Sequence, residues 1–551
     1  MATGIEAAIA ALHAGNLQLA EKLCSQAQQR NPFDAAVVDI MAMIHLKKGD
    51  GKTALSLIKN AISMDGLQPL FHNHHGIILK SLGFLKDSYQ AYQRALTQDP
   101  EAPDVLFNLA ILCREMGDLE ESLTLGRRAT ELDPSNAAAF NNFGTANQDL
   151  GRFEEAADAY RTAIKLDPGH VGAYCNLAAV LAESDQIHEA LTVCHEALEK
   201  WPEHAEILNA ESNAHIKVHD WNAALIAAEK SISSNPEFAQ AHYSKSIILL
   251  TQARLEEGWP EFEWRVRRTN FWPQRDYDKP LWNGGSLAGK KLLVHWEQGF
   301  GDILQFSRYL TLIRGLDPPP TTLLFDCPAK LIPFFSDWDC IDTIGDFGDA
   351  PPEFDVFTPL MSLPHLLGTT LETIPADTPY LTNSLTEYVK VPVLRRDNLK
   401  VGIVWASDHG NSYRRKLCPV KEIASLFDIE DITFYNLQFG DEAKKIEAYT
   451  SRANVQNMAN ELGDFDHTAA IIKQMDMILS IDTYIVHLAG AMNIPVWVML
   501  AFAPDWRWFL DRSDSPWYPC AKLFRQKHPG DWTSVLDAIR KELKFLMVNK
   551  K

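Results

Sequence analysis

The chain has 551 residues, of which 46% are hydrophobic and 23% are charged, and its formal net charge is −20. This length is too great for one hydrophobic core, and the composition is that of a globular protein with two to four domains. The acidic excess argues against nucleic acid as the main partner, because phosphate binding needs a basic surface.

The first residues, MATGIEAAIAALHAGN, predict an amphipathic helix and not a signal peptide, because they lack a basic segment. The eight cysteines form no C-x-x-C pair, which argues against a zinc site and suits a reducing, cytoplasmic compartment. No apolar stretch is free enough of polar residues to cross a bilayer.

The first half of the sequence repeats with a period of 34 residues, seen for example in Pro100, Pro134, Pro168, Pro202 and Pro236. Glycines keep the same period at Gly15, Gly49, Gly83, Gly117 and Gly151, and alanines at Ala27, Ala61, Ala95, Ala129, Ala163 and Ala197. The glycine would end the first helix of each unit, the alanine would let two helices pack closely, and the proline would stop the second helix. The pattern resembles the tetratricopeptide repeat and predicts an α-solenoid domain over 1–272, with an irregular last unit from Ala239.

Three asparagines, Asn108, Asn142 and Asn176, also follow this period. Asparagine side chains donate and accept hydrogen bonds, so a row of them on the concave face of a solenoid would hold an extended peptide by its backbone. The row resembles the asparagine ladder in the repeats of O-linked N-acetylglucosamine transferase. The alternative is that these side chains bond to other helices within the array.

From Lys291 onward, short apolar segments alternate with segments of helical spacing, which predicts parallel sheets. Strands are expected at 291–296, 322–326, 340–344, 354–357, 400–405, 432–437, 477–480 and 496–500. The proline-bearing segment 374–381 would connect two series of strands. We therefore expect two Rossmann-like lobes, 273–395 and 396–551, with a cleft between them, which is the architecture called GT-B among glycosyltransferases.

The segment KLLVHWEQGFGDILQFSRYL, at 291–310, predicts a strand, a turn containing Gly299 and Gly301, and a helix that begins near Asp302. The two glycines would allow the backbone to approach a ligand closely. Ligands of open α/β sheets bind at the carboxyl ends of the strands, so Asp302 would point into a cleft. The alternative is that Asp302 only caps the helix.

Residues 291–530 resemble the catalytic half of bacterial tetratricopeptide-repeat glycosyltransferases, which are related to heptosyltransferases and to O-linked N-acetylglucosamine transferase. The matching motifs are HWEQGFGDILQFSRY, FDVFTPLMSLP, VGIVWAS, SIDTYIVHLAGAMNIPVWVML and FAPDWRWFLDRSDSPWYP. The resemblance implies an inverting, metal-independent protein O-glycosyltransferase that moves a sugar from a nucleotide-sugar donor to Ser or Thr. Flagellin glycosyltransferases are one branch of this group, which suggests flagellin as acceptor and a CMP-linked nonulosonic acid, such as pseudaminic acid, as donor.

The same resemblance implies roles for individual residues. Asp302 would be the general base, with Glu297 as the competing base or as a tie within the loop. Asp482 would cap a helix or contact ribose, and Thr483 and the neighbouring helix end would bind phosphate. Further donor-site candidates are the basic run Arg414, Arg415 and Lys416, together with Gln438 and His487.

Two other functions are compatible with the sequence. The α/β half could be a degenerate, non-catalytic part of a scaffold, although the presence of Asp302, Asp482 and Thr483 speaks against this. The enzyme could instead act on a lipid-linked saccharide, although no basic amphipathic surface helix is predicted.

Overall fold

The computed structural model describes residues 4–268, 275, 277–348, 350–381, 398–407 and 416–550. The chain forms two compact units, Met1–Pro202 and Glu203–Lys551, which are described separately below. Arg414 and Arg415 lie outside the described residues, as do the two domain boundaries expected after residues 272 and 395.

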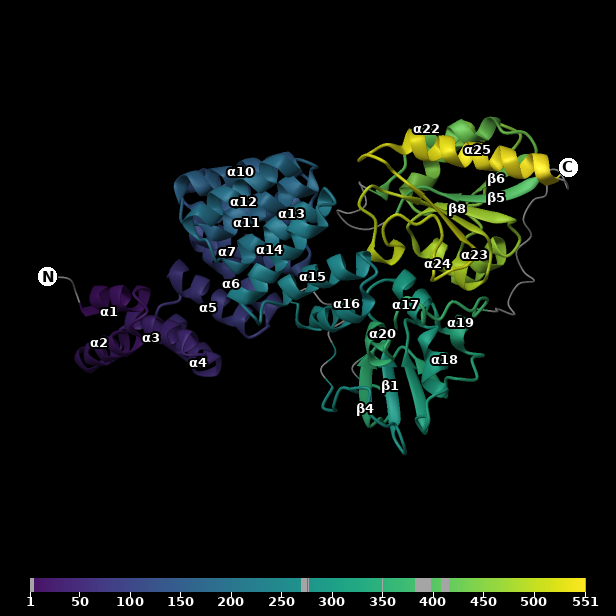
Figure 1. Cartoon of the computed structure of the whole chain (residues 1–551). Helices are drawn as coiled ribbons and strands as arrows, with labels where there is room; N and C mark the ends of the chain where they lie inside the picture. Colours follow the sequence, from purple (N-terminus) through teal and green to yellow (C-terminus); the bar gives the residue numbers. More distant parts are fainter. Residues whose placement is uncertain are drawn as a thin grey trace. The chain divides into compact units, whose positions relative to one another are not determined.

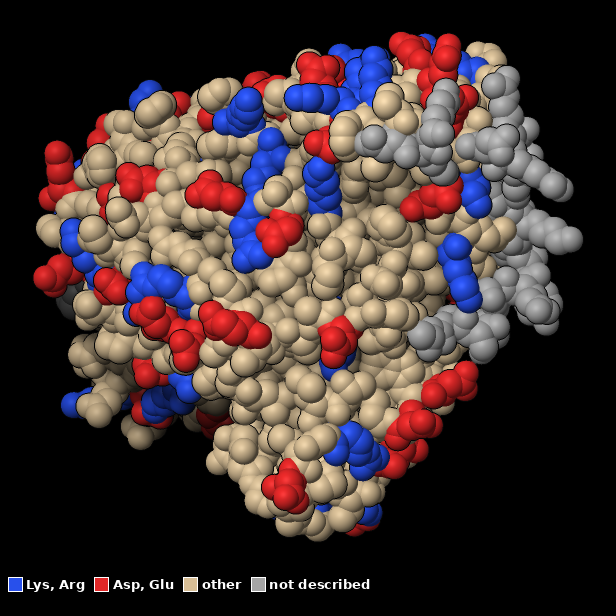
Figure 2. All heavy atoms as spheres, turned by 45° about the vertical axis from the view of Figure 1, so that its right-hand side comes forward, with Lys and Arg blue, Asp and Glu red and all other residues tan. Residues whose placement is uncertain are grey.

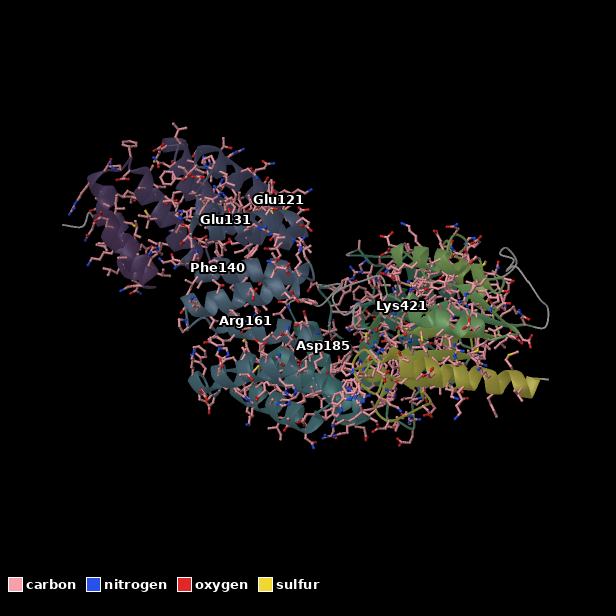
Figure 3. The ribbon with its side chains drawn as sticks, turned by 90° about the horizontal axis from the view of Figure 1, so that it is seen from above. Glu121, Glu131, Phe140, Arg161, Asp185 and Lys421 are labelled. Carbon is pink, nitrogen blue, oxygen red and sulfur yellow. The ribbon has the colours of Figure 1, made fainter. Side chains whose placement is uncertain are left out.

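The first unit is an array of paired antiparallel helices, as the 34-residue period predicts (Figure 1). In Figure 3, the labelled side chains Glu131, Phe140 and Arg161 mark three successive helices of this array. The repeated alanines lie where two helices meet: Ala61, Ala95, Ala163 and Ala197 are completely buried. The helices are α1 (Gly4–His13), α2 (Leu17–Arg30), α3 (Ala35–Lys47), α4 (Gly51–Met64), α5 (Pro69–Ser81), α6 (Leu85–Gln98), α7 (Pro103–Met116), α8 (Leu119–Leu132), α9 (Ala137–Asp149), α10 (Phe153–Leu166), α11 (Val171–Glu183) and α12 (Ile187–Lys200).

The turn after the first helix of each repeat has a left-handed backbone. The five periodic glycines adopt φ values between 71° and 90° there. The equivalent positions of the later repeats, Asp185, His219 and Ala253, keep this conformation with φ of 63°, 60° and 60°. A side chain in this region costs about 1–2 kcal/mol, so the helix packing of these repeats enforces a turn that glycine would adopt without strain.

The second unit begins with helices that continue the repeat pattern, namely α13 (Ala205–Lys217), α14 (Trp221–Ser234), α15 (Ala239–Thr251), α16 (Leu255–Phe262) and η1 (Glu263–Arg267). Arg265 of η1 is 1% exposed and forms two hydrogen bonds, of 2.7 and 2.9 Å, to the carboxylate of the fully buried Glu297. Trp259 donates its indole N–H to the carbonyl of Thr369 at 2.9 Å. These contacts make the last repeat helices part of the α/β core.

The first sheet has four parallel strands in the order β3-β2-β1-β4. They are β1 (Lys291–His295), β2 (Thr322–Asp326), β3 (Thr343–Gly345) and β4 (Val356–Pro359). The chain reverses its direction of strand addition between β1 and β4, so the turn after β1 opens at a topological switch point. This turn leads into α17 (Phe300–Phe306), followed by α18 (Tyr309–Arg314), α19 (Ile332–Phe335) and α20 (Leu363–Leu366).

The second sheet has six parallel strands in the order β10-β9-β8-β5-β6-β7, with its switch point between β5 and β8. The strands are β5 (Leu399–Val404), β6 (Ile432–Asn436), β7 (Val455–Asn457), β8 (Met477–Ile481), β9 (Val496–Leu500) and β10 (Ala521–Arg525). Both edge strands, β7 and β10, were absent from the expected set. The helices and 3-10 turns of this lobe are α22 (Val420–Ile423), η3 (Ala424–Asp428), η4 (Asp441–Tyr449), α23 (Phe465–Ile472), α24 (Tyr484–Ala491), η5 (Trp506–Trp508) and α25 (Trp532–Lys550).

Surface charge is mixed in sign. Over the face shown in Figure 2, basic side chains are interspersed among acidic ones. Within the described part of the chain, no helix combines the length and the apolar character needed to cross a membrane.

The buried pair of Arg265 and Glu297 yields a test of the link between the repeats and the α/β core. Arg265→Met should lower the free energy of unfolding by about 3–5 kcal/mol, because it leaves the Glu297 carboxylate buried without its cation. Arg267→Met is the matched control, since Arg267 pairs with Glu237 at the surface and both side chains are mostly exposed. Its loss should cost about 0–1 kcal/mol. Equal denaturant midpoints for the two variants would contradict the structural role of Arg265.

Candidate functional site

A cavity of about 480 Å³ opens at the switch point of the second sheet. The carboxyl ends of its central strands supply most of the lining, and Phe300 and Lys330 of the first lobe complete it. A cavity of this size at this place in a parallel sheet is where ligands of such folds bind. Its lining from the second lobe comprises Val404, Ala406, Ser407, Leu437, Gln438, Phe439, Gly463, Asp464, Phe465, Thr483, Tyr484 and Ile485.

Four aromatic residues, Phe300, Phe439, Phe465 and Tyr484, line part of the cavity. Phe300 and Phe465 have ring centroids 4.8 Å apart, Phe465 and Tyr484 are 5.2 Å apart, and Phe439 lies 6.2 Å from Tyr484. Such faces suit a flat, apolar ligand group such as a nucleobase. These aromatic residues and Lys330 are not among the site residues predicted from the sequence. Their position just after strands or in glycine turns is the local signal that points to them.

Polar groups enter the cavity from the start of α24. Thr483 is the N-cap residue of this helix, and its hydroxyl lies 3.2 Å from that of Ser480. The first N–H groups of a helix attract anions, and Thr483 and Tyr484 bring them to the cavity wall. Thr483 therefore lines the cavity, and its contact with a phosphate stays a prediction.

Asp482 and Lys416 form an ion pair next to Thr483, with 2.7 Å between Oδ2 and Nζ. Burial alone would raise the pKa of Asp482, but the attraction of Lys416 and neighbouring cations outweighs it and lowers the pKa to about 2. Asp482 in turn raises the pKa of Lys416. Lys416 therefore has a carboxylate partner already, so its role as a phosphate clamp would require that pair to open.

Asp302 lies on α17, two residues beyond Phe300 of the cavity wall. Its Oδ2 accepts the N–H of Gly299 at 2.8 Å, and its Oδ1 is paired with Arg507. The helix begins at Phe300 and its N-cap residue is Gly299, so Asp302 is not the N-cap residue: it caps the helix from the first turn, by bonding back to the N-cap N–H. Burial raises the pKa of Asp302 above its usual value, against the opposing attraction of Arg507. The side chain thus caps the helix and is also held by a cation from the other lobe.

Glu297 occupies a different environment from Asp302. Its carboxylate is fully buried, bonded to Arg265 on both oxygens, and accepts the N–H of Met361 at 2.9 Å. A base must reach the proton that it removes, and no part of this carboxylate is exposed. The geometry favours the second predicted role of Glu297, which is to tie the loop together.

Gly301 and His487 lie where α17 of the first lobe packs on α24 of the second (Figure 1). A β-carbon on Gly301 would come within 2.9 Å of the His487 ring, so this glycine is needed for helix packing. The His487 ring bonds to the Tyr518 hydroxyl at 3.0 Å, and burial lowers its pKa to about 3. Both residues were expected in the donor site. The contacts that the structure describes for them are instead in the packing of α17 against α24.

Gln438 lines the cavity, yet its amide is already engaged. Its Oε1 accepts the backbone N–H groups of Trp405 and Ala406 at 3.1 and 2.8 Å, and its Nε2 donates to the carbonyl of Phe439 at 3.0 Å. These bonds shape the loops after β5 and β6, and the expected contact with a base or ribose stays a prediction.

The asparagines of the first unit form bonds between repeats. Asn108 donates to Asn73 and Asn176 donates to Asn141, both at 3.0 Å. Asn142 lines a small hollow formed by α7, α8 and α9. The bonds of Asn108 and Asn176 match the alternative reading, in which the ladder joins neighbouring helices, and peptide binding by these residues stays a prediction.

Known protein families and one known protein match parts of this chain. Family models described as "TPR repeat" and "Tetratricopeptide repeat" match residues 148–185 and 74–137. Protein FlbA of Caulobacter vibrioides is 24% identical over an alignment of 396 residues, and the match covers 63% of this chain and 63% of FlbA. The chain therefore spans less than two thirds of the length of that relative.

Several solved structures match part of the chain. The complex Cut9–Hcn1 matches with a TM-score of 0.40 and 12% identity, over 44% of this chain and 48% of that one. A tetratricopeptide repeat protein from Parabacteroides merdae matches with a TM-score of 0.38 and 18% identity, over 42% and 91%. YrrB, titled a TPR protein with an unusual peptide-binding site, matches with a TM-score of 0.30 and 20% identity, over 34% and 97%. The matched family models show that this chain contains tetratricopeptide repeats, which are protein-interaction modules.

The close contact at Gly301 can be tested by adding one methyl group. Gly301→Ala should cost about 1–3 kcal/mol of stability, because the new β-carbon would overlap the His487 ring in a packed interface. Gly315→Ala is the control, since the nearest atom to its added β-carbon is 3.4 Å away, at the exposed end of α18. Urea unfolding should separate the two variants; a Gly301→Ala protein as stable as the control would contradict the tight packing.

Proposed function

We propose that this chain is a protein O-glycosyltransferase that binds a nucleotide sugar in the cavity of the second lobe. The observation that carries the proposal is the position of this cavity: it lies at a sheet switch point, has aromatic walls, and borders the turn that bears Asp302. The nucleobase would stack on Phe439 or Tyr484, and the phosphate would meet Thr483 and the start of α24.

The reaction needs a base and a way to stabilise the leaving group. The acceptor hydroxyl attacks the anomeric carbon, the bond to phosphate breaks, and the hydroxyl proton passes to the Asp302 carboxylate. A carboxylate has about four lone-pair sites, so the bonds to Gly299 and Arg507 leave Asp302 able to accept a proton. Lys330 and the N-terminus of α24 would stabilise the charge on the departing phosphate.

The repeats would supply the protein acceptor. Solenoids of this kind offer a long concave surface for protein partners, and the proposed chemistry needs a Ser or Thr brought to the cavity. The resemblance to flagellin glycosyltransferases makes flagellin the first acceptor to try, and a CMP-linked nonulosonic acid the first donor.

A scaffold without catalysis is the second candidate. Both oxygens of Asp302 already have partners, and Lys416 is paired with Asp482, as in a site that has become purely structural. Intact-protein mass of flagellin, co-expressed with and without the full chain in cells that make the donor, separates the two functions. A mass increase by one or more sugar units supports the enzyme; an unchanged mass with retained binding of flagellin supports the scaffold.

Donor binding can be tested at the start of α24. Thr483→Ala should weaken nucleotide affinity by about 1–3 kcal/mol, because it removes a hydrogen bond to a charged group. Calorimetric titration with CMP and with UDP provides the measurement. Thr533→Ala, an exposed change on α25, should bind as the unmodified chain does; equal affinities of the two variants would remove Thr483 from the site.

The base can be tested by a change that preserves the helix cap. Asp302→Asn keeps an amide oxygen that can accept the Gly299 N–H, but the amide cannot take the proton. Turnover should therefore fall by about 10²–10⁴-fold while nucleotide affinity stays near that of the unmodified chain. Melting temperature is measured in parallel, because the pair with Arg507 is also weakened.

Asp302→Leu completes this experiment. It removes the cap, the ion pair and the base together, so it should lower both stability and turnover. If Asp302 were only a cap, Asp302→Asn would keep normal turnover and only Asp302→Leu would be damaged.

A further inference from the structure

Arg507, in the loop after β9, binds three side chains at once. Its side chain is 7% exposed, and each of its nitrogens has a partner. Nη2 pairs with Asp302 Oδ1, Nη1 donates to Asp505 Oδ1 at 2.8 Å, and Nε donates to Gln305 Oε1 at 2.7 Å. Asp302 and Gln305 both lie on α17, so the Arg507 guanidinium of the second lobe binds two side chains of one helix of the first lobe.

The position of the guanidinium is over-determined. It lies over the ring of Trp506 at 4.6 Å and near that of Phe306 at 5.4 Å. Asp505 accepts a hydrogen bond from the guanidinium, and the same carboxylate accepts the backbone N–H of Arg507 at 3.1 Å. The planar guanidinium of Arg507 is hydrogen-bonded along its edge and packed against aromatic rings on its face, so its position is fixed. The Asp302 carboxylate that is bonded to it therefore has little freedom to rotate.

Other charged groups face this cluster from the surrounding elements. Asp505 and Glu297 repel the Asp302 carboxylate, whereas Arg507 is the cation that opposes the effect of burial on its pKa. Asp482, which is paired with Lys416, also interacts electrostatically with Arg507, and His487 is uncharged in this setting because burial lowers its pKa to about 3. Tyr243 of α15, which packs on the same loop, carries Arg268 against its ring at 4.1 Å.

We propose that Arg507 is the positioning residue of the reaction, which keeps the Asp302 carboxylate ionised and oriented toward the acceptor hydroxyl. The inference rests on the proposed function. Because Arg507 and Asp302 belong to different lobes, the base is competent only while the loop after β9 lies against α17. Lysine would supply the charge at this place but not the three directed bonds.

The test compares the pH dependence of kcat/KM for Arg507→Gln and Arg507→Lys in the full chain, with flagellin and the CMP-linked sugar as substrates. Removal of the cation raises the pKa of Asp302, so the acid limb of the Arg507→Gln profile should move upward by about 1–3 pH units. Arg507→Lys keeps the charge, so its acid limb should stay near that of the unmodified chain, while kcat falls at least about 10-fold through lost orientation.

The matched control is Arg512→Gln, in the same loop region. Arg512 forms a two-bond pair with Asp514, at 3.0 and 2.7 Å, and this pair is more exposed than that of Arg507. Its profile and kcat should be unchanged.

Each outcome has one meaning. An acid limb that does not move in folded Arg507→Gln, or full kcat in Arg507→Lys, would overturn the inference. If Arg507→Gln does not fold, Arg507→Lys alone decides by its kcat at unchanged KM for the donor. Absence of any sugar transfer by the unmodified chain would instead overturn the proposed function.

Discussion

The bond pair between Arg265 and Glu297 joins the last repeat helices to the turn that precedes α17. Glu297 lies between β1 and the glycine turn. Arg265, which is bonded to Glu297, therefore also fixes the position of this turn. Two fully buried charges are costly unless they are paired and hydrogen-bonded, and here Ser362 and the Met361 N–H complete the set. The place of Asp302 is therefore set from outside the sheet, by a residue of the repeat array.

The second constraint is the tight contact of the lobes. Gly301 lets α17 approach α24 until its backbone lies against His487, and Arg507 closes the same contact from the loop after β9. The cavity borders this contact, so ligand binding and lobe packing share the elements α17 and α24. The proposed catalysis would therefore depend on the packing of α17 against α24 and against the loop after β9.

Local patterns in the sequence predict the architecture well. The 34-residue period yields the paired helices. Eight of the ten strands in the described part of the chain lie at or close to their expected places, because buried parallel strands are continuous apolar runs. The edge strands β7 and β10 do not follow this rule: VQN is short, and AKLFR is interrupted by charged residues.

The site is less predictable from the sequence than the fold. Asp302 and Arg507 are 205 positions apart, and nothing local in either segment signals that they meet. Gly301 and Gln438 were recognisable as special positions, but their partners are protein atoms that only the fold brings to them.

The left-handed turn at His219 has a consequence for how the protein unfolds. Glycine is absent from this position, and the imidazole instead stacks on Phe502 with centroids 4.0 Å apart and planes 7° from parallel. The repeat that carries it is thereby tied to the loop that bears Arg507, whereas the repeats of the first unit contact chiefly their neighbours in sequence. In such linear arrays, cooperativity decays from one repeat to the next. The first unit should therefore melt as a graded, zipper-like array, and the last repeats should share the single sharp transition of the α/β core.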